Sequence, residues 1–377
     1  MKIGKLFLAG VVALGLGLTA CNNDTPEVQK EGGILTVSVI PVSEPGGQTR
    51  IAGDINAAAL ATAESAVKGY EVWVFNTNGN LEKYHQQADA ANAQILGLTV
   101  GTKEVVVVAN ANLGTQPNKA ALLAKTNTLS QSIDGGMVMT MEPTQITLDP
   151  CNAEHSDCNT LTAEVKRVNA RVAVVGVKTS FADDAPYKKF ELAEVAMFNV
   201  RQTSNIFGAS LLNATSAFLF GSAYPSPDNS YVVGTVEPTL LETTGLPLDV
   251  TTTELTAAQS KYFYVHENDA TTAKQETFLV LKGKLYDENG VVYELPGVHT
   301  DAQGFTYYKV YVNALMDGYT YNEGHTADGT VIRNTQYNIT IDLTKAGNPT
   351  IDEPAEACLK VTVSVVPWVV VNQNVSW

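Results

Sequence analysis

The segment from Leu359 onward most constrains the fold of this chain, because it reads as a strand that has to be buried somewhere. Apolar and polar residues alternate with a period of two over Leu359–Val365, which is typical of a half-buried β-strand. Pro367 interrupts the alternation, and a second apolar run covers Trp368–Val371. At ~3.3 Å per residue, the stretch up to Trp377 could reach roughly 60 Å. It therefore either crosses two sheets of its own domain or completes a sheet in a neighbouring molecule.

Short strands separated by turns also dominate the rest of the chain, and helical patterns are few. Val105–Val108 is a continuous β-branched run, which suits a strand buried on both faces. Asn289-Gly290 supplies a tight turn between two strand candidates. The 377 residues suffice for two cores. We therefore predict an all-β chain of two β-sandwich domains, over residues 51–168 and 169–377.

The first twenty residues have the features of an export signal. Lys2 and Lys5 precede an apolar run, Leu6–Leu18, that ends in Leu-Thr-Ala before Cys21. Small residues just before a cysteine form a lipobox, so we expect cleavage after residue 20 and a lipid anchor on Cys21. The alternative is an ordinary secretory signal followed by a chance cysteine. Either way the protein is exported, and disulfides are permitted.

Residues 21–50 predict a polar tether, one strand and an exposed loop. Leu35, Val37 and Val39 alternate with polar residues and indicate the strand. The loop over Ser43–Arg50 is rich in turn-forming residues. Arg50 in such a loop suits cleavage by an arginine-specific protease. On these residues alone, a solvated loop charge is the better interpretation.

Two cysteines bracket a short polar loop in the middle of the chain. Cys151 and Cys158 favour a disulfide, although His155 between them leaves a metal knuckle as the alternative. Two thiolates and one imidazole lack a fourth ligand, so we predict no metal site. Cys358 remains unpaired, either buried and inert or available to pair with another chain.

The sequence lacks the residue patterns of common catalytic and cofactor sites. It has no glycine-rich phosphate loop, no CxxC, no HExxH and no GxSxG, and its five histidines are scattered. We therefore predict no catalytic residues, no cofactor and no enzymatic activity. The net charge of −15 makes nucleic acid and anionic membrane surfaces unfavourable electrostatic partners.

Several segments in a fixed order resemble the fimbrillins of Bacteroidales, the subunits of type V pili, and especially the minor-fimbrillin, Mfa-like branch. They are the lipobox ending in Cys21, the strand and turn leading to Arg50, GTKEVVVVANA from Gly101, KRVNAR around Arg167, LVLKGKL from Leu279, YNITIDL from Tyr337 and VTVSVVPW from Val361. The resemblance covers most of the chain.

This resemblance implies two tandem transthyretin-like β-sandwich domains with a few short helices, exported as an outer-membrane lipoprotein. It further implies that an arginine-specific protease cuts between Arg50 and Ile51 and removes the strand of Leu35, Val37 and Val39. The vacated groove would then accept a donor tail, residues 359–377, from the next subunit. The donor residues would be Leu359, Val361, Val363, Val365 and Trp368. Since the groove is filled before cleavage, we expect the tail to have no site of its own in the monomer.

The resulting functional prediction is a structural subunit of a cell-surface pilus that supports adhesion, most simply a stalk subunit. Its partners would be identical or related pilin subunits, joined head-to-tail. The alternative is a surface glycan-binding β-sandwich lipoprotein, which would need an exposed aromatic platform. Trp73 lies in an alternating strand and is expected in the core, which leaves tyrosines such as Tyr307 and Tyr308 for that role.

Overall fold

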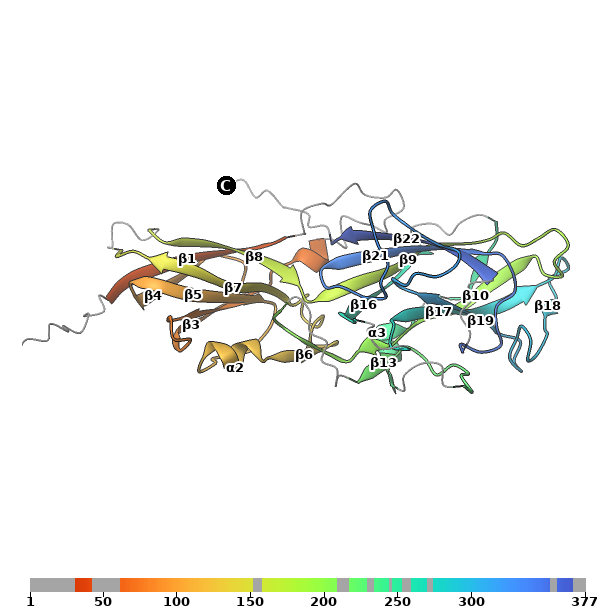
Figure 1. Ribbon diagram of the computed structural model, residues 1–377, viewed down its shortest axis with the longest axis horizontal. Coiled ribbons are helices and arrows are strands. Elements are labelled where there is room, and N and C mark those ends of the chain that lie inside the picture. Colours follow the sequence, from red (N-terminus) through yellow and green to blue (C-terminus); the bar gives the residue numbers. More distant parts are fainter. Residues whose placement is uncertain are drawn as a thin grey trace, which may run out of the picture.

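The computed structural model describes residues 31–42, 62–151, 158–208, 217–228, 234–243, 246–252, 259–269, 274–352 and 358–368. These residues form an elongated molecule in which two β-rich parts follow each other along the long axis (Figure 1). The predicted all-β class, with β-sandwiches and a few short helices, is confirmed. Within the described residues, no helix is long and apolar enough to span a membrane.

The N-terminal part is built on a seven-stranded sheet of order β3-β2-β5-β7-β8-β1-β4. Its strands are β1 (Glu31–Pro41), β2 (Tyr70–Phe75), β3 (Leu81–Gln87), β4 (Ala93–Thr99), β5 (Gly101–Ala109), β7 (Met139–Leu148) and β8 (Thr160–Arg167). Strands β7 and β8 pair only at Met139–Thr140. The sheet therefore folds over between them, and β8, β1 and β4 enclose one core with β2, β5 and β7.

The valine run of β5 is buried on both faces, as predicted. Val105 and Val107 face the core shared with β1, while Val106 and Val108 face a second cluster on the other side of the sheet. That second cluster includes Leu122 of α2 (Lys119–Leu123), the helix that β6 (Thr126–Thr128) follows in the chain. It also contains Trp73, which is fully buried, as predicted.

The C-terminal part consists mainly of two facing sheets and a short helix. Its elements are β9 (Asn169–Thr179), β10 (Lys189–Phe198), β11 (Val200–Arg201), β12 (Thr203–Asn205), β13 (Phe218–Phe220), β14 (Thr235–Val236), α3 (Pro238–Leu241), β15 (Leu248–Val250), β16 (Lys261–His266), β17 (Phe278–Tyr286), β18 (Val292–Tyr293), β19 (Thr306–Tyr311), β20 (Tyr319–Tyr321), β21 (Thr335–Leu343) and β22 (Leu359–Pro367). One sheet has the order β16-β9-β21-β22-β20, and the other has the order β15-β10-β17-β18 with β19 also paired to β17. Residues of both sheets form one large core.

The two parts meet where β8 gives way to β9. Val168 separates β8 from β9 within the basic run around Arg167. Strand β8 belongs to the N-terminal sheet and β9 to the C-terminal one. A second connection crosses the junction, because β6 pairs antiparallel with β12.

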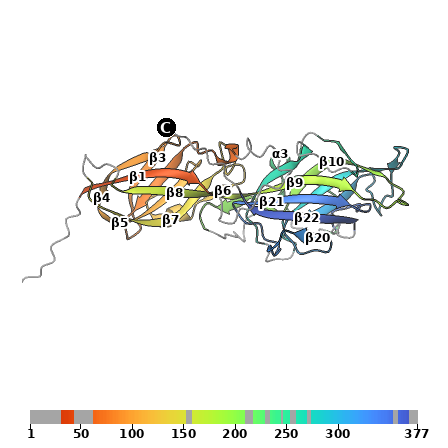
Figure 2. The ribbon, with the colours of Figure 1, turned by 90° about the horizontal axis from the view of Figure 1, so that it is seen from above.

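Strand β22 lies inside the sheet of its own protomer, between β21 and β20 (Figure 2). It pairs antiparallel with β21 along its whole length, from Leu359 opposite Leu343 to Pro367 opposite Thr335. The prediction that the tail has no site of its own in the monomer is therefore wrong for residues 359–368. The alternating side chains that suggested a donor strand fill the core between the two C-terminal sheets. Residues 369–377 lie outside the described part.

Candidate functional site

Strand β1 lies in the interior of its sheet and not at an edge (Figure 2). On one side it runs parallel to β8, with Thr36–Pro41 opposite Thr160–Val165. On the other side it runs antiparallel to β4, with Leu35–Val37 opposite Ala93–Ile95. Removing a strand that is bonded on both sides would leave two rows of backbone donors and acceptors without partners.

The side chains of β1 also complete the N-terminal core. Leu35 and Val37 are fully buried, and Val39 packs against the same cluster while partly exposed. At ~1.5–3 kcal/mol for each fully buried aliphatic side chain, Leu35 and Val37 together contribute roughly 3–6 kcal/mol. The hydroxyl of Tyr70 donates a hydrogen bond to the carbonyl of Val37 at 3.1 Å. The strand is thus held by its backbone and by its side chains.

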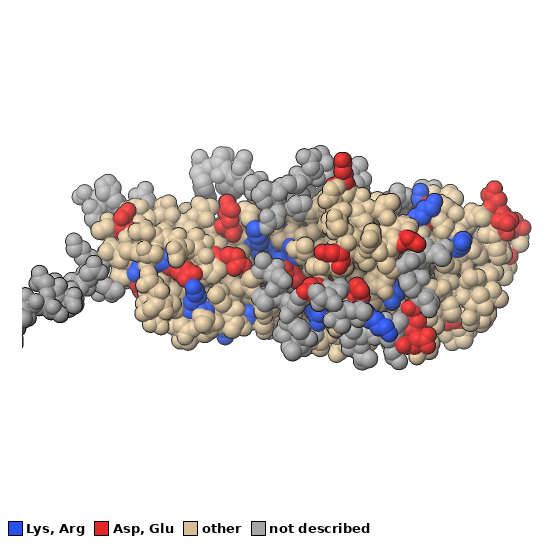
Figure 3. Space-filling model, viewed as in Figure 1, with Lys and Arg blue, Asp and Glu red and all other residues tan. Residues whose placement is uncertain are grey.

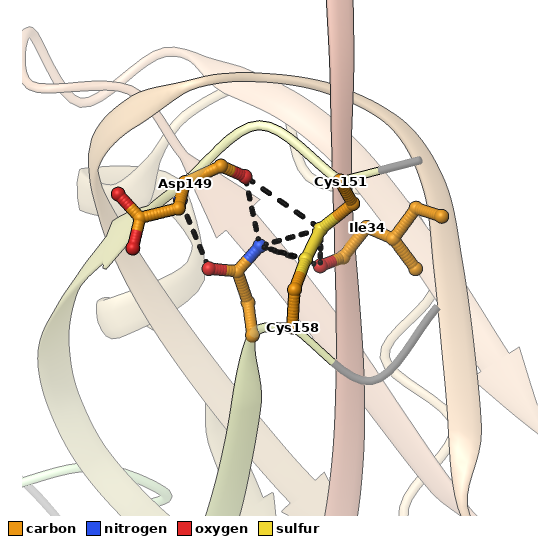
Figure 4. The surroundings of a disulfide bond; sticks show 5 residues. Ile34, Asp149, Cys151 and Cys158 are labelled. Carbon is orange, nitrogen blue, oxygen red and sulfur yellow. Dashed lines mark hydrogen bonds between the residues drawn. A yellow bond between two sulfur atoms is a disulfide. The ribbon is translucent and has the colours of Figure 1, made fainter. Parts of the chain in front are cut away.

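A disulfide lies beside the first half of β1 (Figure 4). The structure joins Cys151 and Cys158 by a disulfide, with Cα atoms 6.0 Å apart. His155, named above as a possible metal ligand, lies outside the described residues. Cys358 is free and partly buried, and it packs against the C-terminal core. In the described part of the chain, no group of three acidic, His or Cys residues is placed to hold a metal ion.

Asn159, the residue after the disulfide, binds β1 through both its backbone and its side chain. Its Nδ2 donates to the carbonyl of Ile34 at 2.9 Å, and its own carbonyl accepts from the N–H of Thr36 at 2.9 Å. The N–H of Cys151 donates to the carbonyl of Gly32 at 3.0 Å. We call Cys151, Cys158 and Asn159 the clasp. All of these contacts reach backbone atoms of β1, so the clasp would hold any extended segment in the same register.

A buried charged cluster lies at the junction of the two parts, around Glu64. This residue belongs to a helical turn at residues 62–65. Its carboxylate accepts hydrogen bonds from Arg171 Nη1 at 3.0 Å, from the Tyr264 hydroxyl at 2.8 Å and from Trp368 Nε1 at 2.8 Å. All four residues except Tyr264 are buried. The cluster thus fixes the base of the tail, Trp368, to a residue of the N-terminal part.

Arg167 closes the cluster from the other side. Its guanidinium lies 4.7 Å from the ring centre of Trp368, and its Nε donates to the backbone carbonyl of Glu64 at 3.0 Å. The ring of Tyr264 stacks on Trp368 with 5.8 Å between centres. The indole is therefore in contact with a cation and a second ring, and both contacts stabilise its position beyond the contribution of burial.

Burial shifts the ionisation of groups in this cluster. Desolvation lowers the pKa of Arg167 to about 10, although the Glu64 carboxylate opposes the shift. Desolvation and the neighbouring Glu64 raise the pKa of the Tyr264 hydroxyl. Arg167 remains a cation and Tyr264 remains a neutral donor at physiological pH, as the hydrogen bonds require.

Asn334 connects the end of β1 to the same cluster. Its Nδ2 donates to the carbonyl of Val42 at 3.3 Å, and its Oδ1 accepts from the backbone N–H of Arg167 at 3.3 Å. Its own carbonyl accepts from the N–H of Trp368 at 3.0 Å. Asn334 adopts φ = 55°, a left-handed conformation that asparagine tolerates better than most residues. The residue therefore lies between β1 and the base of the tail.

The structure separates the predicted site residues into three groups. Leu35, Val37 and Val39 lie in β1, and Leu359, Val361, Val363 and Val365 lie in β22. Trp368 follows β22 at the junction. Cys21, Arg50 and Ile51 lie outside the described residues, as do residues 1–20.

Sequence reasoning missed Glu64, Asn159 and Asn334. The one available signal was the basic run around Arg167 and Arg171, because arginines inside a strand pattern require a buried acidic partner. Nothing in the sequence selects Glu64 as that partner, since it lies 107 positions from Arg171.

The surface offers little support for the residues named in the glycan-binding alternative. Tyr307 and Tyr308 are buried. Among the described aromatic residues, only Tyr262 is exposed, at 38%. On the face shown in Figure 3, Lys and Arg side chains are scattered among acidic ones and form no continuous basic surface.

Comparisons with known proteins agree along the whole chain. The model of the FimA4 pilin C-terminal domain matches residues 169–368, and the model of the major fimbrial subunit protein (FimA) matches residues 35–175. A major fimbrium subunit FimA type-4 of Porphyromonas gingivalis is 30% identical over 410 residues, with 100% of both chains covered. A FimA type-2 subunit of the same organism is 27% identical over 411 residues, again with 100% of both covered.

Solved structures show the same similarity. A fimbrilin (FimA) of Porphyromonas gingivalis superposes with a TM-score of 0.68 at 26% identity, covering 90% of this chain and 99% of the other. A putative cell adhesion protein of Parabacteroides distasonis shares the fold, with a TM-score of 0.62 at 16% identity over 89% of this chain and 99% of the other.

Proposed function

The chain belongs to the FimA family of major fimbrial subunit proteins, and we propose that it forms the stalk of a surface fimbria by exchanging strands between subunits. Like its relatives, it is a structural pilus subunit and not an enzyme. The finer steps are our proposal: proteolytic removal of β1, and insertion of a tail segment from the next subunit into the groove between β4 and β8.

The position of β1 is the observation that carries this proposal. Because β1 lies between β8 and β4, its removal would open a groove with hydrogen-bonding edges on both sides and an apolar floor. The open groove should bind an extended segment that restores both hydrogen-bond ladders and fills the positions of Leu35 and Val37, because water cannot fill these apolar positions favourably. The clasp would fix the register of the incoming segment.

The proposed donor lies further along the tail than β22. Strand β22 already fills its own sheet, so it anchors the tail, and the donor is the sequence after Trp368. Val369, Val371, Val375 and Trp377 alternate there with Val370, Asn372, Asn374 and Ser376, with Gln373 an exception on the apolar side. This period of two matches that of Leu35, Val37 and Val39 in β1. At ~3.3 Å per residue, the segment could extend over roughly 30 Å.

The proposed contact is head-to-tail and therefore builds a filament. The groove lies in the N-terminal part and the donor follows the C-terminal part, so each subunit offers one of each. Such heterologous contacts continue without closing. We further propose that the precursor reaches the outer membrane through a lipid on Cys21, and that an arginine-specific protease cuts at Arg50 to release β1 and allow assembly into cell-surface fimbriae.

A matched pair of tail variants tests the donor. We expect Val371→Asp with Val375→Asp to abolish filaments after proteolysis, because each buried unpaired charge costs several kcal/mol. The same change on the other face, Asn372→Asp with Asn374→Asp, should leave assembly intact. Both proteins should fold and be cleaved like the wild type, as checked by circular dichroism and mass spectrometry.

Negative-stain electron microscopy of the cleaved proteins is the readout. Filaments of normal length from the Val371/Val375 variant would exclude residues 369–377 as the donor. Loss of filaments from both variants would indicate a general charge effect and would equally contradict the proposed alternation.

A further inference from the structure

Hydrogen bonds connect Trp368 to both sides of the segment that carries Arg50: through Asn334 to Val42 upstream, and directly to Glu64 downstream. Upstream, the carbonyl of Val42 accepts a hydrogen bond from Asn334 Nδ2, and the carbonyl of Asn334 accepts one from the N–H of Trp368. Downstream, the carboxylate of Glu64 accepts a hydrogen bond from Trp368 Nε1 at 2.8 Å. The base of the tail is thus held by two routes, one through its backbone and one through its indole.

The upstream route depends on β1. Val42 directly follows β1, and its N–H is bonded to the carbonyl of Val165 in β8, so it belongs to the segment that strand removal would take away. The structure gives Val42 as the acceptor for Asn334 Nδ2. Asn334 is only 2% exposed, so loss of that acceptor would leave an amide donor unpaired in the interior.

We propose that Asn334 and Glu64 are positioning residues for assembly: they hold Trp368 in place while β1 is present, and Asn334 loosens that hold when β1 leaves. This inference rests on the proposed function and adds its regulation. The precursor keeps the base of its tail fixed, and cleavage frees it to turn toward the next subunit.

The two routes have different consequences. When β1 leaves, Asn334 Nδ2 has to find a new acceptor, while the N–H of Asn334 stays bonded to the carbonyl of Asn169 at 2.8 Å and its Oδ1 stays bonded to Arg167. The N–H of Trp368 then loses a firmly placed acceptor. The indole remains bonded to Glu64, and β22 remains paired with β21. Only the last residues of the strand should become looser.

Hydrogen exchange on the full-length, non-lipidated protein tests this proposal. Samples are compared before and after treatment with an arginine-specific protease, at low concentration and before filaments form. In the wild type we expect amides of Ser364–Trp368 to exchange about tenfold faster after cleavage. The N–H of Val361, bonded to the carbonyl of Gly318 at the far end of β22, should not change.

Three variants separate coupling from general destabilisation. Asn334→Asp keeps the size and the tolerance for positive φ but removes the donor, so exchange should be fast before cleavage and change little afterwards. Asn338→Asp, four residues further on in β21, makes the same chemical change away from Val42 and should keep the tenfold response. Glu64→Gln should raise exchange in both states and keep the ratio.

The proposal is overturned if cleavage leaves the wild-type exchange of Ser364–Trp368 unchanged, or if Asn334→Asp responds to cleavage as Asn338→Asp does. Filaments are scored separately on concentrated samples. If cleavage does not change the exchange of Ser364–Trp368 but the protein still polymerises, only the coupling between β1 and the tail is rejected. A protein that is cut but never polymerises rejects the proposed function, whatever the exchange shows.

Discussion

Replacing Val37 by Ala should weaken β1 in the precursor and leave the mature filament unaffected. Val37 is fully buried in the N-terminal core, and the substitution removes two methylene equivalents at ~0.8 kcal/mol each. A residual cavity brings the loss to about 2 kcal/mol. Since 1.4 kcal/mol corresponds to a factor of ten, the cut strand should dissociate roughly thirty times faster. The filament lacks β1 under this account, so its stability should equal that of the wild type.

The assay follows loss of the β1 fragment after cleavage, by size exclusion and mass spectrometry over time. Ser38→Ala is the matched control, because Ser38 lies on the opposite face of the same strand and is partly exposed. Equal release rates for the two variants would refute the assignment of Val37 to the core contact. Filaments of Val37→Ala that melt earlier than those of the wild type would show that β1 stays in the mature subunit.

Three further predictions concern other residues of the site and its surroundings. Asn159→Ala removes the side-chain bond to the carbonyl of Ile34 and should destabilise the precursor by about 1 kcal/mol in urea unfolding. If the same substitution destabilised a protein that lacks residues 21–50 by the same amount, the clasp would not act on β1. Arg171→Met removes the cation that forms an ion pair with the buried Glu64 carboxylate and should cost about 3–5 kcal/mol, and a cost below about 1 kcal/mol would contradict the pairing. Burial lowers the pKa of His266 to about 3 from 6.5, so the unfolded chain binds the extra proton between these values, and stability falls as pH drops below about 6.5. The loss should reach about 2 kcal/mol at pH 5, and His266→Phe should flatten this dependence; an unchanged slope would show that other groups carry it.

The sequence was sufficient for features that depend on local pattern. Leu35, Val37 and Val39 alternate, and they form β1 as expected. Val105–Val108 indicated a strand buried on both faces, because four adjacent β-branched residues cannot all face one side. The short loop between Cys151 and Cys158 permits a disulfide whatever the fold around it.

Features that depend on distant partners could not be predicted in the same way. Alternation in residues 359–365 indicates a half-buried strand, but it carries no information on whose sheet buries it, and the structure places it in its own. Glu64 and Trp368 are 304 positions apart and meet only because the two domains pack end to end. Nothing in the sequence distinguishes Asn334 from the other asparagines; its left-handed backbone and its position between β1 and the tail appear only in the structure.

The central claim is that assembly replaces β1 by a strand from another subunit. Its most direct test treats the non-lipidated precursor with an arginine-specific protease and examines the product by electron microscopy and intact mass spectrometry. We predict filaments whose subunits begin at Ile51 and retain no fragment containing β1, and we predict only folded monomers from Arg50→Ala. Filaments that still contain residues 31–41, or filaments from Arg50→Ala at wild-type abundance, would contradict it.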